Sequence, residues 1–180
     1  MSIEEIKALP ITDLAAEAAV IWLWVTNAHM FDARDIVESW GFTYRTIVTW
    51  TKTTQPVLGH WFQSRTEHVV LATRGSPPWN RCVASNVIEA PRQRHSGKPD
   101  EFFDLVDLVC PDQRRLEMFS REPRDGWAAW GLGGSAMVRL GYLPYTRSPF
   151  HGPTGRPLSP KVTRWCDESD YVRAILLECG

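Results

Sequence analysis

The chain has 180 residues, of which 43% are hydrophobic and 23% charged, and its formal net charge at pH 7 is −1. This length is sufficient for one domain with a hydrophobic core. No apolar run approaches the roughly 20 residues of a membrane-spanning helix, so we expect no membrane partner. The four cysteines include no CxxC pair and no metal-ligand spacing, so we expect a reduced, cytoplasmic protein that binds no metal.

The near-neutral charge is unevenly distributed along the chain. Residues 1–44 carry seven acids and two bases, a charge of −5, whereas residues 45–98 carry eight bases and two acids, a charge of +6. The remaining residues contribute −2. A basic middle third fits a surface that contacts a polyanion, and it fits an ordinary solvated surface equally well.

Capping residues and apolar runs predict the first two elements. Ser2 and Glu5 have the spacing of a capping box, which predicts a short helix that begins at Ile3 and is stopped by Pro10. The continuous apolar run Ala19–Val25 is typical of a strand buried on both faces.

A helix and two neighbouring strands are expected next. The helix begins at about Met30 and ends before Gly41, which occupies the position of a left-handed C-terminal cap. Strands are expected at Tyr44–Thr51 and Glu67–Thr73, and because no helical pattern lies between them we expect them to pair antiparallel. The apolar face predicted for the helix comprises Phe31, Ala33, Ile36, Val37 and Trp40.

The next segment returns to strand, helix and strand. Asn86–Glu89 is expected as a short strand, Asp100–Val109 as a helix with Pro99 at its first turn, and Arg115–Ser120 as a further strand. This alternation predicts an α/β sheet with helices on its faces. Ligands of such sheets bind beyond the carboxyl ends of the strands.

The composition changes after Gly131, where the chain becomes rich in glycine and proline. We therefore expect an α/β domain over residues 1–131 and a weakly ordered tail over residues 132–180. Within the tail, Asp167–Glu178 is expected to form one terminal helix, and Ala136–Tyr142 is the only segment with the character of a strand.

Four segments carry a resemblance to a known family: LWVTN at residues 23–27, TKTTQPVLGHWFQSRTEH at 51–68, KPDE at 98–101, and RRLEMFSRE at 114–122. In this order they resemble the S-adenosylmethionine-dependent adenine N(6) methyltransferases typified by the catalytic subunit of the messenger-RNA adenosine methyltransferase (MT-A type). The resemblance covers residues 1 to about 131. It implies a Rossmann-like methyltransferase sheet, S-adenosylmethionine as cofactor, and adenine in nucleic acid as substrate, with DNA favoured because the compact form is similar to small bacterial or phage members.

The resemblance also implies roles for individual residues. Lys98 and Arg121 correspond to residues that contact the cofactor, and an arginine offers a planar fork of donors suited to ribose hydroxyls or a carboxylate. Alternatives remain for single residues: Lys98 also fits a solvated cation, and Trp61 fits a loop anchor. Asn27 follows a predicted strand, where its side chain could face the ligand, but a cap for the next helix is the favoured interpretation. The residues implied to border the substrate are Glu67, Gly59, His60, Trp61 and Arg65.

The family's catalytic tetrapeptide, Asp-Pro-Pro-Trp, does not occur in this sequence. In the family it follows a strand in the middle of the sheet, so we expect a sheet that lacks a central strand and dimerises through an open edge unless the tail supplies a replacement. Ser76, Pro77, Pro78 and Trp79 fit a relaxed form of the tetrapeptide, but Arg74 and Gly75 separate them from the preceding strand, and this context favours a plain proline turn. Two further interpretations stay open, namely a non-catalytic nucleic-acid-binding module or partner subunit, and a truncated reading frame.

Overall fold

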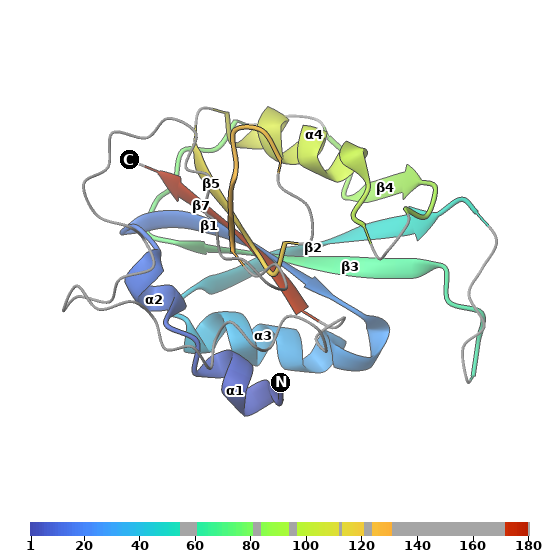
Figure 1. Ribbon diagram of the computed structural model, residues 1–180, viewed down its shortest axis with the longest axis horizontal. Coiled ribbons are helices and arrows are strands. Elements are labelled where there is room, and N and C mark those ends of the chain that lie inside the picture. The colour runs from blue at the N-terminus through green and yellow to red at the C-terminus, as the bar shows by residue number, and fades with distance from the viewer. Residues whose placement is uncertain are drawn as a thin grey trace.

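The computed structural model describes residues 1–54, 61–80, 84–93, 97–111, 113–120, 124–130 and 172–179. These residues form short helices and a single mixed sheet (Figure 1). The helices are α1 (Ile3–Lys7), α2 (Ile11–Leu14), the 3-10 turn η1 (Asn27–His29), α3 (Met30–Ser39) and α4 (Asp100–Val109). The strands are β1 (Ala18–Val25), β2 (Thr43–Lys52), β3 (Thr66–Arg74), β4 (Val87–Ala90), β5 (Arg114–Met118), β6 (Ala128–Trp130) and β7 (Val172–Cys179).

The described strands form one seven-stranded sheet in the order β4-β2-β3-β1-β7-β5-β6. β2 and β4 pair parallel, as do β5 and β6, whereas β3 runs antiparallel to both β1 and β2. β7 lies antiparallel between β1 and β5, so those two strands run in the same direction. The carboxyl ends of β1, β2, β4 and β5 therefore all lie at the same end of the sheet, which we call the carboxyl rim.

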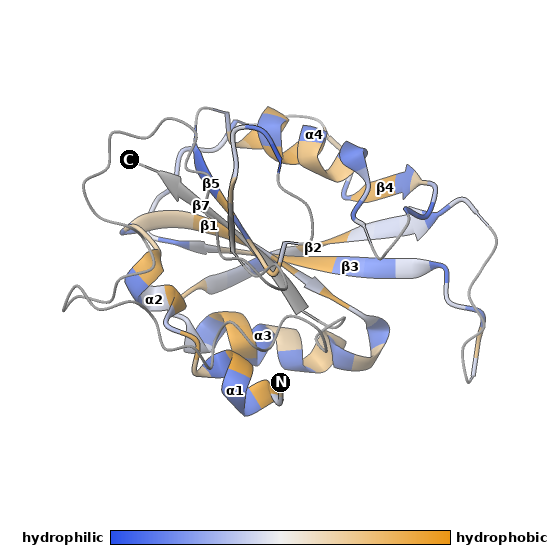
Figure 2. Cartoon of the chain, in the orientation of Figure 1, coloured by the Kyte–Doolittle hydropathy of each residue, from blue (hydrophilic) through white to orange (hydrophobic). Residues whose placement is uncertain are grey.

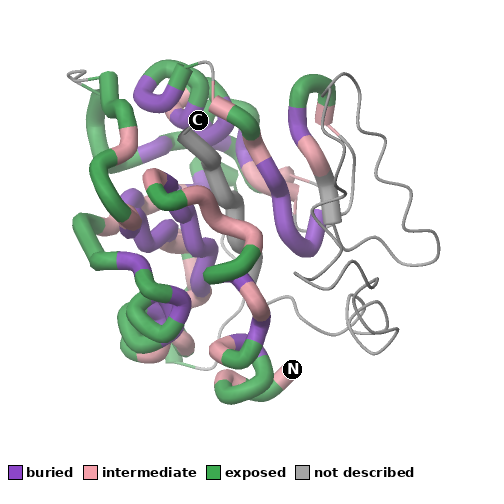
Figure 3. The backbone as a smooth tube through the Cα atoms, turned by 90° about the vertical axis from the view of Figure 1, so that its left-hand side faces the viewer, coloured by how far each residue is buried: buried purple, intermediate pink, exposed green. Residues whose placement is uncertain are grey.

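The sheet is covered on both faces, as the sequence predicted. α1, α2 and α3 lie on one face and α4 on the other (Figure 1). Alternate residues of β1 enter the two cores: Ile21 and Leu23 pack toward α3, whereas Trp22 and Trp24 pack toward Phe102 of α4. The apolar sides of the helices face the sheet (Figure 2). The buried residues lie where the helices pack against the strands (Figure 3).

Most elements predicted before the tail are confirmed to within about two residues. The capping box at α1 is present, and Gly41 adopts a φ of +78° after α3. The assignment of Phe31 to the apolar face of this helix was wrong, because Phe31 is 93% exposed. Ala33, Ile36 and Val37 share one side of α3, and Phe31, two positions before Ala33, points elsewhere.

The predicted terminal helix at Asp167–Glu178 was wrong, because Val172–Cys179 is the strand β7. A short apolar run is compatible with helix or strand, and here the surroundings decide. β1 and β5 need hydrogen-bond partners on the sides that face each other, and a strand satisfies both ladders where a helix satisfies neither. β7 thus occupies the central position that was expected to lack a strand. The expected strand Ala136–Tyr142 and the domain boundary at Gly131 fall outside the described residues.

Candidate adenine and cofactor site

The carboxyl rim brings together charged residues from two strands and from the segment before α4. Lys52 is the last residue of β2, Glu67 is the second residue of β3, and Lys98 lies two residues before α4. β2 and β3 pair antiparallel, with Trp50 opposite Glu67, so the end of one strand and the start of the other lie side by side. The fold therefore brings together residues that are up to 46 positions apart in the chain.

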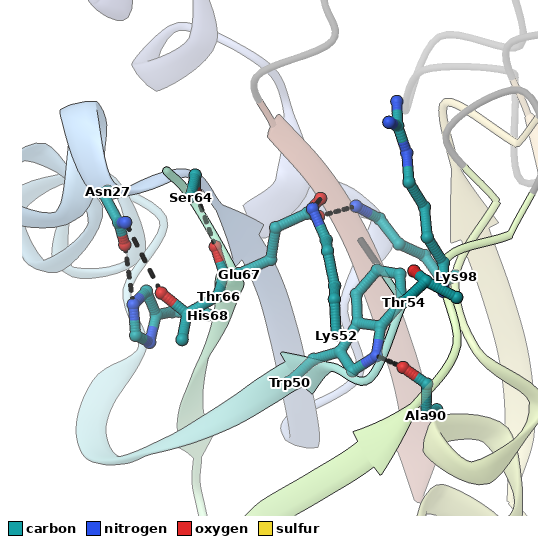
Figure 4. Close-up of polar contacts among 11 residues, drawn as sticks. Asn27, Trp50, Lys52, Thr54, Ser64, Thr66, Glu67, His68, Ala90 and Lys98 are labelled. Carbon is teal, nitrogen blue, oxygen red and sulfur yellow. Dashed lines mark hydrogen bonds and ion pairs between the residues drawn. The ribbon is translucent and has the colours of Figure 1, made fainter. Parts of the chain in front are cut away.

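Glu67 bridges the two lysines (Figure 4). Lys52 Nζ donates to Oε1 of Glu67 at 2.7 Å, and Lys98 Nζ donates to Oε2 at 2.6 Å. The lysine side chains are only 10% and 9% exposed, and the glutamate side chain 22%. We call these three residues the Lys–Glu–Lys cluster.

Aromatic rings line the inner side of the cluster. Lys98 Nζ lies 4.4 Å from the centroid of the Trp24 ring, and Lys52 Nζ lies 5.1 Å from that of Trp50. The two rings meet edge to face, and Trp50 Nε1 donates to the carbonyl of Ala90. Both ammonium groups thus receive cation–π contacts in a partly desolvated setting, where such contacts are strongest.

The charge state of Glu67 follows from these contacts. Burial pushes the pKa of its carboxyl upward, but the charges of Lys98 and Lys52 and their hydrogen bonds outweigh burial, so the pKa lies below its ordinary value. Glu67 is therefore ionised at neutral pH, and the cluster carries one positive charge in excess. Such a site favours an anionic or acceptor-rich ligand.

A second polar group lies beside the cluster. His68 Nε2 lies 2.7 Å from Oδ1 of Asn27, and its Nδ1 lies 3.1 Å from Oγ1 of Thr49. Burial lowers the pKa of His68, which the charge of Glu67 offsets only in part. The helix-cap interpretation of Asn27 was wrong, because Thr26 and not Asn27 occupies the N-cap position of η1, and the Asn27 amide bonds to His68 and Thr66.

The described part of β5 ends at the same rim. Register places Glu117 level with Trp22 of β1, since both pair with Ile175. Beyond the strand, Phe119 has a φ of +61°, a conformation that costs of order 1–3 kcal/mol in a non-glycine residue and is concentrated at functional sites. Buried Ser120 donates from Oγ to the carboxylate of Glu117 at 3.0 Å and fixes this turn.

The predicted site residues meet different outcomes. Glu67 and Lys98 are in contact, and Arg65 lies next to the cluster, with its guanidinium 3.4 Å from the carbonyl of Lys52. Trp61 lies in the segment before β3, with its side chain 84% exposed. The remaining three, Gly59, His60 and Arg121, lie outside the described residues.

Ser76–Trp79 lies at the opposite end of the sheet. It follows Arg74, which pairs with Ala19 at the start of β1, whereas Glu67 and His68 lie level with the end of β1. The Trp79 ring stacks on Trp22, with centroids 6.0 Å apart and an angle of 25° between the planes. The structure thus separates this segment from the Lys–Glu–Lys cluster, and ring packing accounts for its aromatic residue.

Two residues of the cluster region were not among the predicted site residues. Lys52 is one of the few buried charged residues in the described part of the chain, and Trp24 is 2% exposed. The sequence holds a signal for Lys52, because a lysine directly after the predicted strand Tyr44–Thr51 falls on the rim where ligands bind. Trp24 gives no such signal, because only the fold places its ring against Lys98.

The donors at the rim fit a ligand with carboxylate, hydroxyl or ring-nitrogen acceptors. Lys98 supplies a largely buried ammonium group, and the indole Nε1 of Trp24 is buried with no hydrogen-bond partner among the described residues. S-Adenosylmethionine offers acceptors of all three kinds. Within the described residues, no cluster of three His, Cys, Asp or Glu side chains could hold a metal ion, and none of the helices is long and apolar enough to cross a membrane.

The model of the MT-A70 family matches residues 1–133. Relatives include the N(6)-adenosine-methyltransferase MT-A70-like protein of Drosophila melanogaster, 33% identical, and the N(6)-adenosine-methyltransferase MT-A70-like of Arabidopsis thaliana, 29% identical. Each match covers 89% of this chain but only 28% and 25% of the relative. The Type II methyltransferase M.MunI of Mycoplasma sp is 28% identical over 73% of this chain and 58% of its own length.

The chain thus spans about a quarter of the length of the first two relatives and more than half of the third. The family match extends from α1 through β6, so it includes the whole Lys–Glu–Lys cluster. Sheet, rim and sequence motifs agree, and the chain belongs to the MT-A70 family.

Proposed function

We propose that this chain forms the cofactor- and adenine-binding part of an N(6)-adenine methyltransferase that uses S-adenosylmethionine and acts on nucleic acid. The observation that carries the proposal is the bridge from Glu67 to Lys52 and Lys98 at the carboxyl rim. DNA is our first choice of substrate, on the resemblance to compact family members, and the assays below include RNA.

The bound cofactor supplies an electrophilic methyl group, and the chain has to place the adenine amino nitrogen against it. That nitrogen attacks only when its lone pair is drawn out of conjugation with the ring, which hydrogen-bond acceptors for the amino hydrogens achieve. Ionised Glu67 is such an acceptor, since each carboxylate oxygen has two lone pairs and Lys52 and Lys98 use one on each. We assign Glu67 to the substrate base and Lys98 to the cofactor.

Exposed aromatic residues suit the approach of an unpaired base. Trp61 and Phe62 are 84% and 86% exposed and precede β3, the strand that carries Glu67. A base must leave its stack before its amino group can be methylated, and aromatic faces hold unstacked bases without regard to sequence. Exposed Arg65 and Arg92 add positive charge at this rim.

A binding experiment tests the site directly. We expect Lys98→Met to weaken the binding of S-adenosylhomocysteine, measured by calorimetry, by about 10-fold or more, as for loss of a charge-assisted hydrogen bond. Lys7→Met is the matched control, because Lys7 pairs with Glu4 on α1, away from the rim. Equal affinity in the two variants refutes the assignment of Lys98.

A transfer experiment tests the chemistry. We expect a polypeptide of these 180 residues to bind the cofactor without transferring a tritiated methyl group to DNA or RNA oligonucleotides, because Asp-Pro-Pro-Trp is not among its residues. Turnover that survives Ser76→Ala and Trp79→Ala contradicts this account. Turnover abolished by those changes makes Ser76–Trp79 the catalytic segment.

A second candidate function is a nucleic-acid-binding module or partner subunit that does not itself catalyse transfer. The observation in its favour is the placement of Ser76–Trp79 at the far end of the sheet from Glu67. In both functions, neutralising Arg65, Arg92 and Arg94 together should weaken nucleic-acid binding and flatten its salt dependence. Only the methyltransferase function requires that S-adenosylhomocysteine binds and that Lys98→Met weakens it.

A further inference from the structure

Lys52 is held on every side. Its backbone N–H donates to the carbonyl of Arg65 at 2.8 Å, and its carbonyl accepts from the Arg65 guanidinium at 3.4 Å. Its ammonium group lies over the Trp50 ring, and Trp50 is in turn fixed by its hydrogen bond to Ala90. With 8% of its surface exposed, Lys52 has little room to leave Glu67.

Lys98 is placed differently. It belongs to the segment that leads into α4 and lies outside any helix or strand, although its ammonium group also contacts Glu67 and the Trp24 ring. The two lysines hold different oxygens of Glu67, so one can move without disturbing the contact of the other. The Glu67 carboxylate is thus held by one lysine from a strand and one from a connecting segment. We call this unequal pair of contacts the clamp.

The charges show what this asymmetry achieves. If Lys98 turns toward a ligand, Glu67 keeps one partner, Lys52, and remains a paired carboxylate instead of a buried unpaired charge. Without Lys52, the same movement would leave Glu67 unpaired, so Lys98 would be held back by the carboxylate. Lys52 therefore decides whether Lys98 is available.

We propose that Lys52 is a positioning residue that fixes Glu67 in place so that Lys98 can exchange its contact with Glu67 for one with the cofactor. This inference rests on the proposed function, in which Lys98 contacts the cofactor and Glu67 the adenine base. Lys52 itself touches neither ligand and acts through Glu67.

The first arm of the test follows Glu67 by carbon-13 NMR of its carboxyl group. Among the described residues the charged groups that act on Glu67 are Lys52 from β2 and Lys98 from the segment before α4, and His68 is its neighbour on β3. Lys52→Met should raise the pKa of Glu67 and Lys52→Arg should restore it. A Lys52 that serves only packing would lower the melting temperature in Lys52→Met and leave the titration of Glu67 unchanged, which overturns the proposal.

The second arm measures binding of S-adenosylhomocysteine. Lys52→Met should weaken binding by about 10-fold, since Lys98 is then retained by Glu67, and Lys52→Arg should bind as the wild type does. In a Glu67→Gln background the retaining charge is gone, so Lys52→Met should have no further effect on affinity. An equal loss in both backgrounds would show that Lys52 acts independently of Glu67 and overturn the proposal.

The two arms separate failure of this inference from failure of the proposed function. The titration of Glu67 needs no ligand, so it reports on the clamp even if S-adenosylhomocysteine does not bind the wild type. Absence of binding by the wild type refutes the proposed function, whereas binding that is indifferent to Lys52 refutes only the positioning role. If Lys52→Met does not fold, Lys52→Gln replaces it in both arms, with the same expected directions.

Discussion

Replacing Leu176 by proline tests the central place of β7. Leu176 lies opposite Ile21 of β1 and opposite Leu116 of β5, so its N–H faces a neighbouring strand whichever way it points. Proline removes that donor and leaves an acceptor unpaired inside the sheet, which costs about 1–3 kcal/mol. Only four residue pairs join β7 to β5, so the break weakens a large part of that ladder.

We therefore expect Leu176→Pro to lower the free energy of unfolding by about 3 kcal/mol relative to Leu176→Ala, against roughly 5–15 kcal/mol for a typical domain. The alanine variant is the reference because it shortens the side chain and keeps the N–H. Urea unfolding followed by tryptophan fluorescence measures the difference, since Trp22 and Trp24 are buried on β1, the strand that pairs with β7.

Proline in an edge strand supplies the second control. Val87 begins β4 at the edge of the sheet, and its N–H donates to the side chain of Ser85 at 3.0 Å. Val87→Pro should cost no more than about 1.5 kcal/mol, because edge strands tolerate proline and only one exposed hydrogen bond is lost. Identical unfolding of Leu176→Pro and Leu176→Ala would refute the pairing of β7 with β1 and β5.

Three further predictions concern the rim and the turn at the opposite end. The pKa of Glu67 lies below its ordinary value of 4.5, so its ion pairs contribute stability above that pH and lose it as the pH falls through the folded pKa. The stability difference between wild type and Glu67→Gln should be constant near neutrality and shrink in acid urea melts, and a difference that grows in acid contradicts the pairing. Trp61→Ala and Phe62→Ala should leave the melting temperature nearly unchanged. They should weaken single-stranded DNA binding by about 1–3 kcal/mol per stacked base, measured by fluorescence anisotropy. A lower melting temperature with unchanged DNA binding would instead make the two residues structural anchors. Gly75→Ala should destabilise by about 1–3 kcal/mol more than Gly126→Ala in thermal melts, because both have positive φ but only at Gly75 would a Cβ overlap the backbone just before β1; equal losses refute the close approach.

Local patterns predicted the first part of the sheet because each element carries its own signal. The continuous apolar run of β1 and the capping box of α1 depend on neighbours a few residues away. The family resemblance, and no local pattern, assigned Glu67 to the substrate and Lys98 to the cofactor, and the fold brings the two side chains into contact.

The tail could not be predicted in the same way. Val172–Cys179 has enough apolar residues for either a helix or a strand, and what selects the strand is the pair of unsatisfied edges on β1 and β5. Those edges are distant in sequence, so no local pattern contains them. Asn27 illustrates the same limit at one residue, since its partner His68 is 41 positions away.

Lys52 shows how sequence analysis can miss a candidate site residue. It lies in residues 51–68, one of the segments that carry the family resemblance, but its place after a predicted strand does not by itself distinguish it from an ordinary solvated lysine. Its burial arises from Trp50 of the same strand and from Glu67 of the next one. Only the register of β2 with β3 brings these contacts together.

A crystal structure of the chain with S-adenosylhomocysteine would show which end of the sheet holds the cofactor. We predict a ligand at the carboxyl rim, in contact with Lys98 and adjacent to Glu67, with Lys52 still bonded to Glu67 at its present position. A ligand bound instead at the opposite end of the sheet, beside Ser76–Trp79, would contradict the account. So would a ligand at the rim that leaves the contact between Lys98 and Glu67 unchanged and touches neither residue.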